Sequence, residues 1–158
     1  MSVPPASGPR ELYCLLVPLV GRKLILPRDM IVEVMGTGVV RPPVPGSPAW
    51  HLGWRSWQDR VLPVLSLEGY YGESVPPPTP RSRLVCALAL GGGDRAYYMF
   101  VTRGYPYLLR VTDTVLRPDA EAKDTPGLWA QIRFGNDRPV IPDFVRLERD
   151  LAALPPPP

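Results

Sequence analysis

The sequence has little of what a reactive or metal-binding centre requires: two cysteines and one histidine in 158 residues. Cys14 and Cys86 lie far apart inside apolar runs, which predicts reduced, buried thiols rather than a disulfide framework or a thiolate zinc site. His51 follows Ala49 and Trp50, and this apolar setting predicts a packing or hydrogen-bonding histidine. We therefore expect a non-enzyme with no catalytic residue, no metal ion and no cofactor.

Long hydrophobic runs and runs of like charge are also missing. No apolar stretch approaches the roughly 18 residues that span a bilayer, and residues 1–10 lack the apolar segment of a signal peptide. The 16 arginines and 2 lysines are scattered among 15 acidic residues, giving a net charge of +3. We expect a cytoplasmic protein without membrane insertion, and the net charge alone does not indicate a nucleic-acid partner.

Prolines are abundant but unevenly placed. Eleven of the 23 lie in three clusters, at positions 4–9, 76–80 and 155–158. Because proline lacks a backbone donor, these clusters are excluded from helix interiors and central strands. We predict an N-terminal tail over 1–11, a domain of two lobes over 12–152 with a proline-rich connector over 75–81, and a proline tail over 153–158.

Short apolar bursts between turn signals predict a mainly β fold. A short helical turn is expected after Ser47 and Pro48, ended by Gly53. Near the C-terminus the apolar residues Phe144, Leu147, Leu151 and Leu154 are spaced by three or four positions, and Asp143 is available as an N-cap. This pattern predicts one closing amphipathic helix. The predicted strands cover 12–20, 23–26, 30–35, 61–67, 84–90, 96–102, 107–111, 128–134 and 140–141. Because closure removes exposed edges, we expect two small, closed or nearly closed barrels.

Aromatic residues and arginines concentrate in one segment, with Trp50, Trp54 and Trp57 interleaved with Arg55 and Arg60. Three interpretations remain open. The tryptophans belong to the core, or they form a partner-binding surface, where tryptophan and arginine are favoured. Alternatively, they are stacking platforms of a small β-barrel that binds single-stranded nucleic acid.

Four segments resemble the CheW-like chemotaxis adaptor domain. They are LILPRDMIVEVMG at 24–36, SPAWHLG at 47–53, GWRSWQDRVLPVLSL at 53–67 and VIPDFVRLERDL at 140–151. The ten-residue spacing from Gly53 to Pro63 follows the family pattern. The pattern GWxxW…RxLPVxS resembles that of the divergent, ChpC-type proteins of the Chp chemosensory system, which controls type IV pili and twitching motility.

The resemblance implies two SH3-like five-stranded β-barrels and an adaptor role. Family members join methyl-accepting chemoreceptors to the regulatory domain of a CheA-type histidine kinase. In this chain Ser56, Gln58, Asp59 and Ser66 replace the family's asparagine, arginine, glycine and aspartate. The change at Gln58 and Asp59 predicts that receptor contact is either lost or displaced, with Arg60 able to supply a displaced charge.

The resemblance and the aromatic cluster together predict a partner-binding surface. Ile31 would anchor it, and Glu33 would set its register, since a charge on an apolar strip confers specificity. The predicted surface consists of Ile31, Glu33, Val34, Gly53, Trp57, Gln58, Asp59 and Arg60.

Overall fold

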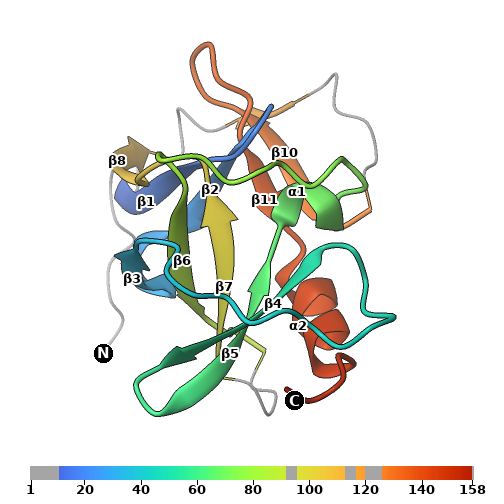
Figure 1. Ribbon diagram of the computed structural model, residues 1–158. Helices are drawn as coiled ribbons and strands as arrows, with labels where there is room; N and C mark the ends of the chain where they lie inside the picture. Colours follow the sequence, from blue (N-terminus) through green and yellow to red (C-terminus); the bar gives the residue numbers. More distant parts are fainter. Residues whose placement is uncertain (1–10, 92–95, 113–116, 120–125, 158) are drawn as a thin grey trace, which may run out of the picture.

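The computed structural model describes residues 11–91, 96–112, 117–119 and 126–157, and its strands form two sheets (Figure 1). The first sheet has the order β8-β1-β2-β11-β10-β9. Its pairs are antiparallel except for the parallel contact between β2 and β11. The strands are β1 Glu11–Pro18, β2 Lys23–Pro27, β8 Tyr107–Thr112, β9 Arg117–Pro118, β10 Leu128–Arg133 and β11 Val140–Pro142.

The second sheet has the order β3-β6-β7-β5-β4, so β3 and β4 lie at its two edges. β5 and β7 are parallel, whereas the remaining neighbours are antiparallel. A 3-10 turn, η1 Arg28–Met30, leads into β3, and a one-turn helix, α1 Leu67–Tyr70, follows β5. The strands are β3 Ile31–Met35, β4 His51–Trp57, β5 Arg60–Leu65, β6 Arg83–Leu88 and β7 Tyr97–Thr102.

Among the residues described, neither ladder of hydrogen bonds closes into a complete barrel. The second sheet comes nearest, because the chain after β3 returns to β4. There Arg41 and Trp54 exchange two backbone hydrogen bonds of 2.8 Å. The Arg55 guanidinium also donates to the carbonyls of Gly36 and Thr37, at 2.5 and 2.8 Å. One bridge and a few side chains thus link the two edges where a closed barrel would have a strand ladder.

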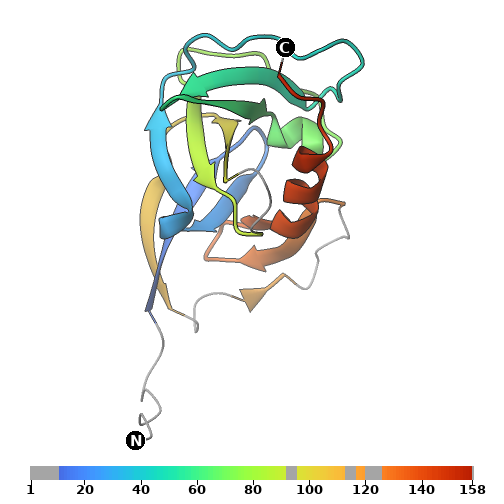
Figure 2. The same cartoon turned by 90° about the horizontal axis from the view of Figure 1, so that it is seen from below.

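One central core joins the two sheets and the C-terminal helix, α2 Phe144–Ala152. It combines residues of β1, β2 and β11 with residues of β5, β6 and β7. Leu147 and Leu151 enter it from α2, which lies beside α1 in Figure 2. The Tyr70 hydroxyl donates to the Asp150 carboxylate at 2.7 Å and ties the two helices together.

The predicted mainly β architecture with one C-terminal helix is confirmed. Asp143 caps α2 as expected, because its side chain accepts the backbone N–H of Arg146 at 3.1 Å. The expected helical turn that Gly53 would end is wrong: residues 49–50 form a simple turn, and Gly53 lies inside β4. The strand signal of β4 was hidden because its residues do not alternate between apolar and polar.

Candidate functional site

Seven of the eight predicted partner-binding residues lie on two elements of the second sheet. Three of them lie on the edge strand β3, and four form the tight turn between β4 and β5. These two elements occupy opposite edges of the ladder, and a side-chain contact brings them together. We call the exposed part of these two elements the β3–turn surface; it comprises Val32, Glu33, Trp57, Gln58, Asp59 and Arg60.

A β-bulge decides which side chains of β3 face outward. Ile31 pairs with Ala87, and Glu33 pairs with the next residue, Cys86, so the register shifts between them. Ile31 and Val34 consequently both pack against the central core, half-buried. Val32 instead is 46% exposed. The apolar contact that β3 offers to solvent is therefore Val32, and Ile31 contributes to packing.

Glu33 and Trp57 connect the edge strand to the turn. The Trp57 indole N–H donates to the Glu33 carboxylate at 2.5 Å. The Trp57 ring lies 5.2 Å from the Tyr97 ring, and the Arg60 guanidinium lies 4.9 Å from the same Tyr97 ring. A carboxylate, two aromatic rings and a guanidinium thus lie close together.

Gln58 and Asp59 form the turn with positive φ values of 45° and 60°. Two successive positive φ values are typical of the type I′ turns that connect two-residue hairpins. Asp tolerates this left-handed region better than most residues, and glycine tolerates it best. The family's glycine at the position of Asp59 therefore has a conformational explanation, and the turn keeps its shape without it.

Gly53 lies in the interior rather than on the surface. Its φ is +143°, and a Cβ at this position would lie 1.9 Å from the Arg41 carbonyl oxygen. The close approach permits the bridge between Arg41 and Trp54. The structure thus assigns Gly53 a role in bringing the two edges of the sheet together.

The Glu33 carboxylate also affects the pKa of a buried neighbour, Cys86. Burial, together with the nearby Glu33 carboxylate, raises the pKa of the Cys86 thiol to about 11. Cys86 is fully buried, as the sequence predicted, and the thiol remains protonated at neutral pH. Cys14 in β1 is half-buried rather than buried as predicted, and partial burial raises the pKa of its thiol as well.

His51 is buried, and its Nε2 lies 2.9 Å from the Gly53 carbonyl oxygen. Its ring stands edge-on to Trp54, with the centroids 5.0 Å apart. The expected packing and hydrogen-bonding role is confirmed. Within the described part of the chain, no three histidine, cysteine or acidic side chains are placed to hold a metal ion. No described helix has the length and hydrophobicity to cross a bilayer.

The tryptophan cluster divides between core and surface. Trp54 is 1% exposed, whereas Trp50 and Trp57 are half-buried and pack against Tyr70 and Tyr97. The three rings do not form an exposed stacking row.

The most exposed tryptophan, Trp129 in β10, was not predicted as a site residue, and it is 71% exposed. It lines an apolar groove of about 570 Å³ between the first sheet and the start of α2. The alternation of β10 is broken at this residue: a register shift separates Leu128 from Ala130. Leu128 packs against the central core, whereas Ile132 belongs to the separate cluster with Leu16 and Ile25. The exposure of Trp129 therefore leaves no periodic signal in the sequence.

Comparison with known proteins agrees with this fold. The family model for the CheW-like domain matches residues 13–147. No curated protein matches the chain. Among solved structures, the scaffolding protein TtCheW from Thermoanaerobacter tengcongensis is similar, with a TM-score of 0.70 and 14% sequence identity over 90% of each chain. The likeness to this structure shows a shared fold. Since the family model covers most of the sequence, the chain belongs to the CheW-like domain family.

Proposed function

We propose that this chain is a cytoplasmic chemosensory adaptor whose β3–turn surface binds the regulatory domain of a CheA-type histidine kinase. Membership of the CheW-like family supports the adaptor role. The observation that carries the choice of surface is the hydrogen bond between Trp57 and Glu33, which fixes an edge strand and a tight turn as one unit. The adaptor role requires binding and positioning, and no residue of the surface is assigned a catalytic task.

The physical character of the surface suits a regulated, reversible contact. Val32 supplies an exposed apolar anchor, and Glu33 and Arg60 supply charges of opposite sign. Interfaces of this kind bury roughly 800 Å² on each partner, and a few anchors contribute most of the binding energy. The charges select the partner and its register more than they add affinity.

For the second partner, a methyl-accepting chemoreceptor, we propose a displaced contact. Gln58 and Asp59 stand where the family has arginine and glycine, so the usual charge is absent from that position. Arg60 follows directly and is anchored above Tyr97, so its guanidinium remains at the turn. We assign Arg60 the role of the displaced charge.

The tryptophan and proline pattern GWxxW…RxLPVxS supports a more specific proposal, a ChpC-type adaptor of a system that controls type IV pili and twitching motility. A deletion strain tests it. We expect loss of twitching with normal assembly of flagella; unchanged twitching would contradict the pilus assignment and leave the kinase contact untouched.

The test of the proposed function is co-purification from the native cell with matched variants. The wild-type chain should retain a CheA-type kinase. Val32→Glu, in the β3–turn surface, should lose it, because a charge replaces the apolar anchor. Val39→Glu is the control, since Val39 is 82% exposed and lies outside the surface. Equal kinase recovery with both variants would contradict the assignment.

A further inference from the structure

A cavity of about 450 Å³ lies under the proline-rich connector, at one end of the second sheet. Its walls are mostly apolar and include Leu52, Val64 and Val101 of the sheet together with Val75 of the connector. Val20, in the turn between β1 and β2, closes one side. The volume is within the range of small-molecule sites, which are typically apolar with a few placed polar groups. None of the β3–turn residues lines this cavity.

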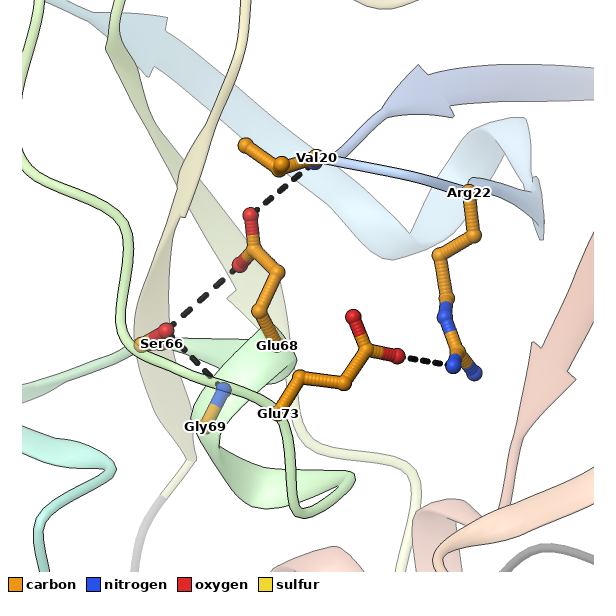
Figure 3. A network of polar contacts seen from close by, with 6 residues as sticks. All are labelled: Val20, Arg22, Ser66, Glu68, Gly69 and Glu73. Carbon is orange, nitrogen blue, oxygen red and sulfur yellow. Dashed lines mark hydrogen bonds and ion pairs between the residues drawn. The ribbon is translucent and has the colours of Figure 1, made fainter.

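The polar group at the centre of this proposal is the carboxylate of Glu68, the second residue of α1. Glu68 is only 4% exposed. Figure 3 shows its carboxylate between two neighbours. One oxygen accepts the backbone N–H of Val20 at 3.1 Å, and the other lies 3.5 Å from the Ser66 hydroxyl. Val20, Ser66 and Glu68 all line the cavity, so the carboxylate forms part of its wall.

The charge of Glu68 is not neutralised by a neighbouring cation. Arg22 approaches from the β1–β2 turn, but its guanidinium pairs with Glu73 (Figure 3). Throughout the described ranges, no arginine or lysine forms an ion pair with Glu68. A buried carboxylate without a counter-ion is costly, and its two oxygens together offer about four acceptor positions. Within the described part of the chain two contacts use these positions, which leaves capacity for a charged donor.

We propose that this cavity binds a small organic monocation, with an ammonium group that donates to Glu68 and an apolar body against Leu52, Val64 and Val101. Arg103 also lines the cavity, but among the described residues it forms no ion pair with Glu68. The ammonium group must therefore lie at the Glu68 end of the cavity, and a second positive group nearer Arg103 would be repelled. The connector at Val75 covers the bound molecule. This binding site does not depend on the adaptor function, because the two involve different residues.

The test is an amide NMR titration of the full chain with hexylammonium, using hexanoate and hexanol as matched probes of the same chain length. We expect saturable shifts of the Val20 and Gly69 amides with hexylammonium, because these amides border Glu68 and Ser66. Hexanoate should bind least. Glu68→Gln keeps an acceptor for Val20 and removes the charge, so the affinity for hexylammonium should fall at least ~10-fold.

A second pair of variants keeps the proposal testable if Glu68→Gln does not fold. Val75→Trp should fill the mouth of the cavity and abolish binding, whereas Val39→Trp, outside the cavity, should leave it unchanged. Equal affinity for the three probes, or shifts that persist in Val75→Trp, would overturn the proposal. The absence of any saturable shift with hexylammonium would also overturn it.

Discussion

Two tryptophan-containing regions of this molecule differ in solvent exposure, and the difference is not evident from the sequence. The segment from Trp50 to Trp57 is dense in aromatic residues, yet its central ring, Trp54, is fully buried. Trp129 stands alone in the sequence, and it is the most exposed of the four tryptophans. A high density of aromatic residues along a chain therefore indicates core packing as readily as a binding surface.

The difference follows from the neighbours of each ring. Trp54 lies opposite Pro63 in the ladder and next to Arg41, where the two edges of the second sheet approach each other. Trp129 lies near the outer edge of the first sheet, where, among the described strands, the two-residue β9 alone follows. A ring between two sheet edges that approach each other is buried, whereas a ring near the outer edge of a sheet remains in solvent.

The largest expected difference between the two tryptophans is in their contribution to the free energy of unfolding. Trp54→Ala should lower the free energy of unfolding by about 3–5 kcal/mol, because it leaves a large cavity in the core. Trp129→Ala should change it by less than about 0.5 kcal/mol, as expected for an exposed side chain. Urea denaturation of both variants measures the difference, and similar midpoints would show that Trp54 is not a core residue.

Gly53 lies in the same edge strand as Trp54, and its substitution tests the close approach of Arg41. Gly53→Ala should cost more than about 2 kcal/mol, because the positive φ and the Arg41 carbonyl both oppose a Cβ. Gly46 has a φ of +88° with open space around it, so Gly46→Ala should cost only about 1 kcal/mol. Thermal unfolding of the two variants tests this order, and a reversed order would remove the role assigned to Gly53.

The free energy of unfolding should depend on pH through the buried thiol of Cys86. Its folded-state pKa, about 11, is above the unfolded value of 9.0, so the folded chain holds this proton more tightly. The contribution is complete below pH 9 and is lost as the pH rises toward 11, by about 1–2 kcal/mol. Burial also raises the pKa of Tyr98, which adds to the loss above pH 10.

Cys86→Ala isolates the thiol contribution from that of Tyr98. Its unfolding free energy should decline less steeply between pH 9 and 11 than that of the wild type. Cys14→Ala is the matched control in the first sheet, where the thiol is half-buried. Identical slopes for wild type and Cys86→Ala would contradict the assigned pKa.

The smallest effect is expected at the turn. Asp59→Gly should stabilise the protein by about 0.5–1 kcal/mol, because glycine adopts a φ of 60° without steric cost. It also restores the family residue. A loss of stability on urea denaturation would show that the Asp59 side chain makes a stabilising contribution at the turn.

Much of the fold could be predicted from local signals. The β1–β2 hairpin follows from Gly21, which adopts a φ of +78°, and the α2 helix follows from the Asp143 cap and the spacing of Leu147 and Leu151. The strand β4 could not be predicted in this way. Its residues are held by a bulge and by the non-local approach of Arg41, and neither leaves a periodic signal.

The residues proposed as the site lie close together, but the sequence does not show which of them are exposed. The turn residues and Glu33 lie together as the family pattern implies. The exposed residue of β3 could not be predicted, because strict alternation places Ile31 beside Glu33 and Met35, whereas a bulge reverses the faces at Val32. The exposure of Trp129 could not be predicted from alternation either, because a register shift between Leu128 and Ala130 interrupts the alternation of β10.

Hydrogen exchange of the chain, alone and with the kinase regulatory domain, would locate the surface that the kinase covers. Backbone amides in 31–35 and 57–60 should exchange more slowly on binding, with β10 unchanged. Slower exchange confined to 128–133, around Trp129, would contradict the proposed surface.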